Sequence, residues 1–496
     1  MVLGIDLGTC NTLCATLSRD GYPVLIPDAY SNLTTMPSMV FIDEDMAIAG
    51  TAAEQHLELK PDKNTIRFFK RNFGTTQPVY FDRNGKPWFS ETVAAIMLKK
   101  VKQNAEMFSP DPVEGVVITV PAHYNDNQRK SVIEAAKLAG LPLQFILDEP
   151  VAGALHYLME ARNDNEIVLV YDYGGGTFDL TLLTKMGREV HTLAKDGLSA
   201  FGGKELDELI ANRIMETYER LFREAFPFDV YNSNKLMRDA EQIKLQLSMQ
   251  MNKRLSKWLY YGQQAFEFTI NPTDFSNLIR QSLQRIDQVI TGCLRSVGIS
   301  QTDVNKVVLI GGSSQFPQVE AFWKERLGAH QQLITHNPMQ SVAMGAALYA
   351  GSLMPGYASR SGQLELKNAS SYNLALSYQD FRAPDDVLLL KNSPLPISVR
   401  RSFQLPPNGK IDYGLVQYWD ASQLFPMGRI IIGPLSSKGY TQVDFVLENR
   451  SNGTIAIKVT EANSDKPVKF QFVKEQSEFS YDFEEQKKQL DKLLVL

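Results

Sequence analysis

Two carboxylates, each set between a short apolar run and a glycine turn, are the residues of this chain best suited to chemistry. Asp172 follows the apolar run 167–170 and precedes Gly174-Gly175-Gly176-Thr177, and Asp6 stands in a similar run before Gly8-Thr9. Glycine has no Cβ, so the backbone N–H groups of such turns can approach an anion closely. Carboxylates would repel that anion unless a hard cation lay between them, and Mg²⁺ prefers carboxylate and phosphate oxygens. The pattern predicts a magnesium–phosphate site built from two similar loops.

A third glycine turn, Gly311-Gly312-Ser313-Ser314, follows the apolar run 307–310. Any one glycine-rich turn is about as often an ordinary β-turn as a phosphate loop. Three such turns after predicted strands, two of them carrying an aspartate, favour a phosphate-binding cleft between two α/β lobes.

The composition excludes several classes of protein. The chain has 496 residues, which predicts about three domains, and its 44% hydrophobic and 22% charged residues are typical of a globular protein. A net charge of −5 without a basic run argues against a nucleic-acid surface. Three cysteines are too few for a disulfide framework or a zinc site. We find no apolar run of ~20 residues and no signal peptide, so we expect a cytoplasmic protein with no membrane span.

Strands and helices alternate through the first 350 residues, as expected of sheets covered by helices. The sequence predicts a hairpin over 12–26 and helices over 91–108, 125–139, 235–251 and 277–297. Beyond residue 355 the helical period disappears and short alternating runs predict an antiparallel β domain. We therefore expect a nucleotide-binding domain over 1–355, a linker over 356–367, a β domain over 368–475 and a short helix over 476–496.

Two sets of polar residues are ambiguous by pattern alone. Glu241, Lys244 and Ser248 share one face of the helix predicted over 235–251, and such a face is usually solvated. It could instead grip a nucleoside. Lys70, beside the aromatic patch that includes Phe68 and Phe69, is likewise most simply a solvated surface charge.

The segments GIDLGTCN, ITVPAHYND, DEPVAGAL, YDYGGGTFDL and VLIGGSSQFP occur in this order. Together they resemble the signatures of the seventy-kilodalton heat-shock protein family, the DnaK-type chaperones, strongly over residues 1 to about 350. The resemblance implies an actin-like two-lobed ATPase domain followed by a β-sandwich that binds unfolded or extended polypeptides. It also implies a slow ATPase that uses ATP, ADP and Mg²⁺, with K⁺ as a further candidate ion, and a role in protein folding and the stress response.

The resemblance assigns roles to matching positions. Asp6 and Asp172 would hold Mg²⁺ through water. The catalytic set would be Thr9, Lys70, Glu149, Thr177 and Asp179. The nucleotide-binding set would be Gly8, Thr9, Cys10, Asn11, Gly174, Gly175, Gly176, Thr177, Gly202, Gly203, Glu241, Lys244, Ser248, Gly311, Gly312, Ser313 and Gln315. Pro121 and Arg129 match a proline switch and its partner, which relay the nucleotide state to the β domain.

The sequence also departs from the family pattern. Gln315 stands where the family commonly has an arginine on the adenine, and Phe145 replaces an arginine used to dock J-domain co-chaperones. Only about one helix follows the β domain, where the family has a helical lid. These departures count against ordinary partnership with a J-domain co-chaperone or a nucleotide exchange factor. They leave open a nucleotide-sensing adaptor with one dedicated protein partner and little turnover. A small-molecule kinase on the same fold ranks third, because it leaves the β domain unexplained.

Overall fold

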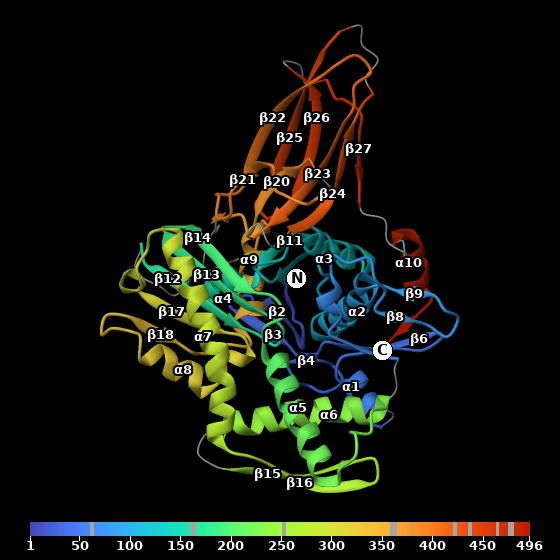
Figure 1. Cartoon of the computed structure of the whole chain (residues 1–496), viewed down its shortest axis with the longest axis vertical. Helices are drawn as coiled ribbons and strands as arrows, with labels where there is room; N and C mark the ends of the chain where they lie inside the picture. The colour runs from blue at the N-terminus through green and yellow to red at the C-terminus, as the bar shows by residue number, and fades with distance from the viewer. Residues whose placement is uncertain are drawn as a thin grey trace.

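The computed structural model describes residues 1–59, 64–158, 165–249, 254–357, 365–378, 380–419, 424–434, 439–462, 466–474 and 481–496. Figure 1 shows a two-lobed body with a β domain projecting from one side of it. We call the lobe that contains the first strand lobe I and the lobe that contains the second glycine turn lobe II.

The central sheet of lobe I has the strand order β11-β10-β1-β2-β3, with β4 paired to β2. Its strands are β1 (Val2–Leu7), β2 (Asn11–Leu17), β3 (Pro23–Ile26), β4 (Met36–Pro37), β10 (Gly115–Val120) and β11 (Leu143–Asp148). The predicted hairpin over 12–26 is confirmed, because β2 and β3 pair antiparallel. Strands β1, β10 and β11 are parallel, so Asp6 and Asp148 reach the same edge of the sheet.

Lobe II repeats this arrangement. Its sheet has the order β18-β17-β12-β13-β14-β19, made of β12 (Ile167–Tyr173), β13 (Phe178–Met186), β14 (Glu189–Leu198), β17 (Lys306–Ile310), β18 (Gln332–Ile334) and β19 (Glu365–Lys367). As in lobe I, the strand that carries the aspartate pairs antiparallel with the strand after it and parallel with a later one. The two halves therefore present equivalent loops.

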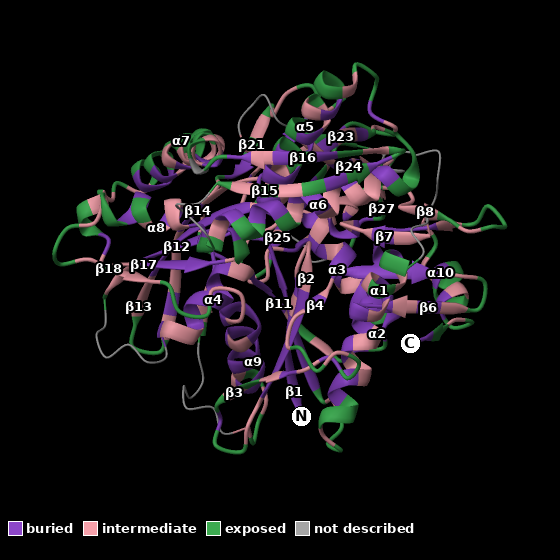
Figure 2. Ribbon diagram, turned by 90° about the horizontal axis from the view of Figure 1, so that it is seen from below, coloured by how far each residue is buried: buried purple, intermediate pink, exposed green. Residues whose placement is uncertain are grey.

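Two helices lie between the sheets, α4 (Glu149–Leu158) and α9 (Ser341–Leu353), and they pack closely. A Cβ on Gly345 would lie 1.8 Å from Ala152 O, and one on Gly4 of β1 would lie 2.0 Å from Ala347 N. Only glycine allows these backbones to approach so closely. Figure 2 shows α9 and β1 as mostly buried, whereas the outer helix α7 has exposed faces.

Further helices cover the outer faces of the lobes. They are α2 (Ser90–Phe108) and α3 (Asp126–Leu138) in lobe I, and α5 (Gly203–Phe222), α6 (Val230–Met249), α7 (Pro272–Ser296) and α8 (Pro317–Lys324) in lobe II. The helices predicted over 91–108, 125–139, 235–251 and 277–297 are confirmed, as α2, α3, α6 and α7. Lobe I also contains α1 (Thr51–Leu59) and the short strands β5 (Met39–Ile42), β6 (Met46–Ala49), β7 (Thr65–Arg67), β8 (Tyr80–Phe81) and β9 (Pro87–Trp88).

The β domain is a sandwich of two antiparallel sheets, ordered β21-β20-β23-β24-β27 and β22-β25-β26. Its strands are β20 (Asn373–Ser377), β21 (Asp386–Leu389), β22 (Ile397–Leu405), β23 (Ile411–Tyr418), β24 (Leu424–Ile432), β25 (Thr441–Asn449), β26 (Ile455–Glu461) and β27 (Phe470–Val473). Inward-facing side chains of both sheets form one core, with Leu374, Leu415 and Phe445 at its centre. This confirms the predicted antiparallel β architecture.

Two strand pairings are absent from the sequence prediction. Strand β24 contains Pro426 and Gly428, which interrupt the alternating pattern, and its partner β23 has a register shift between Leu415 and Val416. The hairpin of β15 (Leu255–Tyr261) and β16 (Gln264–Ile270) in lobe II was also missed.

The C-terminal segment 481–496 lies on lobe I, and we call it the C-terminal strap. Helix α10 (Phe483–Leu490) packs on α2 and α3, and β28 (Leu494–Val495) pairs parallel with β6 (Figure 1). Leu490 and Val495 are buried in the lobe I core. The sequence predicted a short helix over 476–496 at the place where the family has a helical lid. Residues 475–480 lie outside the described residues, and the helix that follows them covers lobe I.

The last residues of the predicted linker form strand β19, which belongs to the sheet of lobe II. Residues 358–364 lie outside the described residues, and β19 pairs parallel with the edge strand β14. The β domain is thus preceded by a strand on lobe II and followed by a strap on lobe I.

Candidate functional site

The glycine turns of the two lobes face each other at contact distance. A Cβ on Gly176 would lie 2.9 Å from Thr9 Oγ1, and a Cβ on Gly175 would lie 2.4 Å from Cys10 Sγ. The first loop therefore packs on the second, and it leaves no room for a Cβ at Gly175 or Gly176. The prediction that both loops serve one site agrees with this geometry.

The third glycine turn joins the same site. Gly311 has φ 83°, and a Cβ there would lie 2.7 Å from Asp172 Oδ1, so this turn needs glycine both for its conformation and for its closeness to the acid. Ser313 Oγ donates to Gly174 O at 2.9 Å. The three turns that the sequence singled out are thus brought together.

The start of helix α5 closes on the second turn. Gly203 N donates to Gly174 O at 3.0 Å and Lys204 N donates to Gly175 O at 2.8 Å. A Cβ on Gly202 would lie 2.6 Å from Gly176 N. The N-terminus of this helix, where anions bind favourably, therefore lies directly beside the turn.

Buried carboxylates crowd the space behind the turns. Burial, followed by the charge of Glu149, raises the pKa of Asp6 to about 7. Burial raises the pKa of Asp172 well above its usual range, and the neighbouring charges of Glu149 and Asp6 add to this rise. Burial also raises the pKa of Glu149, although Lys70 opposes it. The charges that add to these pKa rises belong to Asp6, Glu149 and Asp179, so the four acids lie close enough to repel one another.

This donor set fits a hard cation. Asp179 is fully buried, and its Oδ2 has no hydrogen-bond partner among the described residues. An unpaired carboxylate oxygen beside three other acids is the oxygen-rich setting that Mg²⁺ prefers. Within the described ranges, no three His, Cys, Asp or Glu side chains are placed to ligate one ion directly. That Asp6 and Asp172 hold the ion through water remains a prediction.

Lys70 is a buried residue of the site, so its interpretation as a solvated charge is wrong. Its side chain is 2% exposed, and its Nζ lies 2.6 Å from Glu149 Oε1. The hydroxyl of Tyr124 donates to Lys70 O at 3.1 Å and fixes the backbone there. Lys70 and Glu149, which the resemblance placed in one catalytic set, form an ion pair.

Helix α6 turns two of its predicted side chains toward the cleft. Lys244 Nζ donates to Gly203 O at 3.1 Å and to Asp207 Oδ2 at 2.9 Å. Glu241 pairs with Arg67 of lobe I at 3.4 Å. The interpretation of this face as merely solvated is therefore wrong for these two residues.

Two other residues predicted to contact the nucleoside, Ser248 and Gln315, do not join the contacts of Lys244 and Glu241. Ser248 Oγ donates to Leu245 O of its own helix at 2.7 Å, and Gln315 is exposed. Their nucleotide contact remains a prediction.

Ion pairs close the cleft between the lobes. Besides the pair of Arg67 with Glu241, Arg71 Nη2 lies 2.9 Å from Glu205 Oε1. The cavity between Thr9 and these side chains holds only about 40 Å³. Pockets for organic ligands usually measure roughly 300–1,000 Å³, so this cavity alone is too small for a nucleotide.

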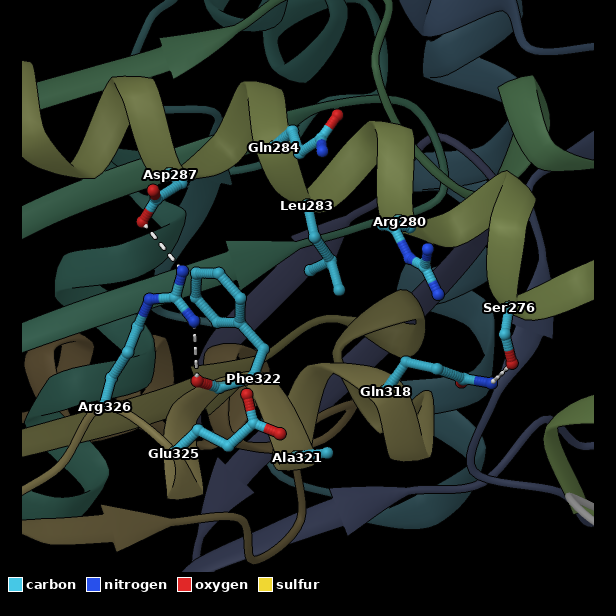
Figure 3. Close-up of a pocket in the computed structure, with 10 residues that line it drawn as sticks. All are labelled: Ser276, Arg280, Leu283, Gln284, Asp287, Gln318, Ala321, Phe322, Glu325 and Arg326. Carbon is cyan, nitrogen blue, oxygen red and sulfur yellow. Dashed lines mark hydrogen bonds and ion pairs between the residues drawn. The ribbon is translucent and has the colours of Figure 1, made fainter. Parts of the chain in front are cut away.

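A larger hollow of about 310 Å³ lies elsewhere, between α7 and α8 (Figure 3). Arg326 stands over the Phe322 ring there and pairs with Asp287 at 3.3 Å. None of the predicted site residues lines it, so we assign it no part in the chemistry.

Sequence reasoning missed several residues that the fold brings to this site. His123 Nδ1 lies 2.8 Å from Asp179 Oδ1, and Asp207 holds Lys244. Asp148 Oδ2 accepts from Lys195 Nζ at 2.5 Å, and its Oδ1 lies 2.8 Å from Arg129 Nη2. The motif ITVPAHYND contained one signal, a histidine three residues after the end of β10, and Asp148, the acid at the end of β11, was another.

The β domain rests on lobe I behind these residues. Arg129 Nη1 donates to Asn452 O at 2.9 Å, and Ile455 N donates to Asp126 Oδ1 at 2.8 Å. Ser371 Oγ donates to Ala122 O at 2.6 Å. Arg129, predicted to partner the proline switch, thus contacts both Asp148 and the β domain.

The β domain contacts lobe II as well. Lys195 Nζ donates to Ala369 O at 2.8 Å, and Lys391 Nζ lies 3.2 Å from Asp196 Oδ1. The β domain therefore bridges the two lobes on the side of the cleft where Asp148 and Glu149 stand.

Two equivalent lobes, converging glycine turns, a shared acid cluster and a docked β-sandwich define an actin-like nucleotide-binding domain with an appended β domain. The family model described as "Hsp70 protein" matches residues 2–387, and the chain belongs to this family.

Curated relatives agree. The chain is 27% identical over 478 residues to the "Chaperone protein DnaK" of Thermosipho melanesiensis, covering 94% of this chain and 79% of that protein. It is also 27% identical over 477 residues to the proteins of the same name from Thermotoga petrophila and a further Thermotoga species. This similarity supports a chaperone function in general, with nucleotide and Mg²⁺ binding. Among the described residues, no helix combines the length and the apolar character needed to cross a bilayer.

Proposed function

We propose that this chain is an ATP-dependent chaperone that binds and releases unfolded or extended polypeptide segments as it hydrolyses Mg·ATP. The observation that carries this proposal is the acid cluster behind three converging glycine turns, with the β domain seated directly against Asp148, the neighbour of Glu149. Asp148, which contacts the β domain, and Glu149, which belongs to the acid cluster, are then adjacent in the chain.

Phosphoryl transfer needs mainly positioning and charge stabilisation. The backbones of both glycine turns, with Thr9 and Thr177, would cradle the phosphates. Lys70 is held by Glu149 at 2.6 Å and would orient the attacking water and offset the developing charge. Asp179 offers one unpaired oxygen to the same space. When bound at Asp6 and Asp172, Mg²⁺ would neutralise phosphate charge, and K⁺ is a further candidate there.

We place the client site in a cavity of about 860 Å³ at the end of the β domain remote from the lobes. Ile431, Val468 and Phe470 contribute apolar walls, and Lys410 and Lys469 stand at its lining. Its volume suits several side chains of an extended segment. Lys410 pairs with Asp412, and Lys466 pairs with Glu461 of the same lining, so Lys469 is the cation we expect to meet an acidic client residue.

An aromatic cluster on the same domain is the competing surface. The Tyr378 and Tyr413 rings lie 4.6 Å apart, and Phe403 lies 5.6 Å from Tyr413. Phe470→Ala and Tyr413→Ala therefore form a matched pair. Loss of peptide affinity in the Tyr413 variant alone would move the client site from the cavity to the cluster.

The decisive experiment measures binding of fluorescent peptides with and without Mg·ATP, together with ATP turnover. We expect ATP to accelerate peptide release, and Lys70→Ala or Thr177→Ala to reduce turnover severely while ATP still binds. Unchanged turnover in both variants would overturn the catalytic assignment. A peptide array with a single ligand and negligible turnover would instead identify the nucleotide-sensing adaptor.

A further inference from the structure

His123 holds the buried carboxylate of Asp179 in place. Two donors of this one residue reach Asp179 Oδ1: the ring Nδ1 at 2.8 Å and the backbone N at 3.1 Å. His123 is 4% exposed and Asp179 is fully buried, so water does not compete for these bonds. Because an ionised carboxylate only accepts hydrogen bonds, we assign the proton of the ring hydrogen bond to Nδ1.

The two oxygens of Asp179 are therefore inequivalent. Oδ1 is occupied by His123, whereas Oδ2 is buried and has no hydrogen-bond partner among the described residues. With one oxygen fixed by two donors, the carboxylate cannot rotate without breaking both bonds. Oδ2 is thereby held in one orientation, and the charge of Asp179 acts on both Glu149 and Asp172.

His123 is itself held from two sides. Its carbonyl accepts a hydrogen bond from the hydroxyl of Tyr372 in the β domain. Its ring meets the Tyr124 ring edge-on, with centroids 5.9 Å apart, and Tyr124 in turn bonds Lys70 O. One short segment therefore connects the docked β domain to both Asp179 and Lys70.

We propose that His123 is a positioning residue for the phosphoryl-transfer site: it orients Asp179 through Nδ1, and the Tyr372 hydroxyl of the docked β domain keeps it in register. The alternative is a buried histidine that merely satisfies its own hydrogen bonds. The positioning role and the structural role of His123 require different features of its side chain. Packing alone needs the ring, whereas positioning needs the donor at the δ position.

The mechanistic part of this inference rests on the proposed function. The first measurement of its test does not depend on that function. The imidazole N–H signals of the protein are recorded by NMR without nucleotide, and only six histidines contribute. We expect one slowly exchanging Nδ1–H signal that disappears in His123→Asn and shifts in Asp179→Asn and Tyr372→Phe. A rapidly exchanging His123 signal, or one indifferent to Asp179→Asn, overturns the proposal whether or not the chain hydrolyses ATP.

The kinetic arm compares His123→Leu with His123→Asn. The asparagine amide offers a donor near the position of Nδ1, whereas leucine fills space without one. We expect His123→Leu to lower kcat at least tenfold with ATP affinity within about twofold, and His123→Asn to recover most of kcat. Tyr372→Phe should lower kcat by a smaller factor, about fivefold for one lost hydrogen bond.

A structural role would give a different pattern. Equal losses of kcat, ATP affinity and thermal midpoint in both His123 variants would overturn the proposal. His191→Asn, a partly exposed histidine on β14, is the matched control and should leave all three values unchanged. A wild-type protein that binds ATP without turnover would refute the proposed function, and the NMR arm would still decide the role of His123.

Discussion

Asp148 and Glu149 are neighbours in the chain, yet their carboxylates serve opposite sides of the molecule. Glu149 pairs with Lys70 in the cleft at 2.6 Å, whereas Asp148 lies between Arg129 and Lys195, which both touch the β domain. The boundary between strand β11 and helix α4 falls between these two residues. The residue that contacts the β-domain-bound cations and the residue that pairs with Lys70 are therefore joined by a single peptide unit.

Asp148→Asn should loosen the docking of the β domain. It leaves Arg129 and Lys195 buried with their charges uncompensated, and breaking a buried pair in this way costs about 3–5 kcal/mol. We expect faster hydrogen exchange at residues 368–372 and 449–455, measured by mass spectrometry. Asp386→Asn, which affects an ion pair with Arg401 within the β domain, is the control. Equal exchange in both variants would contradict the prediction.

The same pair predicts how docking depends on pH. Burial alone would raise the pKa of Asp148, but Arg129 and Lys195 more than offset this and lower it. A carboxyl with a lowered pKa contributes stability above its unfolded value, near 3.8, and loses it as the pH falls through the folded value. Asp148 should therefore protect the docking residues from hydrogen exchange equally from pH 8 to 5. This protection should weaken only below about pH 4. An increase in exchange centred near pH 6 would show that Asp148 is not the group responsible.

Asp207 should behave in the opposite sense. Burial raises its pKa to about 6, although Lys244 opposes the rise. The folded protein then binds the proton more tightly than the unfolded chain, so this group's contribution to the free energy of unfolding falls as the pH rises from about 4 to 6 and is flat above 7. The thermal midpoint of the wild type, relative to Asp207→Asn, should fall over that range. A difference that stays constant from pH 4.5 to 7.5 would count against the shift.

Breaking the ion pairs across the cleft should speed nucleotide release. Arg67–Glu241 and Arg71–Glu205 join lobe I to lobe II, and their side chains are 21–37% exposed. Partly exposed pairs contribute about 0.5 kcal/mol each, so Arg67→Ala and Arg71→Ala should each accelerate release about twofold, and the double variant about fivefold. Stopped-flow displacement of a fluorescent nucleotide measures this. Lys324→Ala removes an exposed pair on α8 and should leave the rate unchanged.

The C-terminal strap should stabilise lobe I. Leu490 is fully buried in the core of that lobe, so Leu490→Ala should cost about 2–5 kcal/mol. Leu494, which is 63% exposed on the same segment, provides the matched control, because Leu494→Ala should cost little. The measurement is the denaturation midpoint, with proteolysis to locate the lobe that opens. Equal effects of the two variants would show that the strap does not contribute through burial.

Much of the fold and part of the site could be predicted from local pattern. The strand–acid–glycine runs around Asp6 and Asp172 identified both loops, since a buried strand and a glycine turn are encoded by adjacent residues. The pattern failed at β24, where Pro426 and Gly428 interrupt the alternation that a strand normally shows. It also failed for Lys70, because a cation beside aromatic residues looks solvated until a partner from another segment is known.

The sequence alone determined the two-lobed architecture, the β domain and the glycine turns, because each of these follows from residues close together in the chain. Only the tertiary structure decided which side chains meet. His123 with Asp179, Lys70 with Glu149, and Asp148 with Lys195 join segments 47–79 residues apart, and the strap reaches β6 from the other end of the chain. Such pairs depend on how the sheets and helices pack, and no local period records that packing.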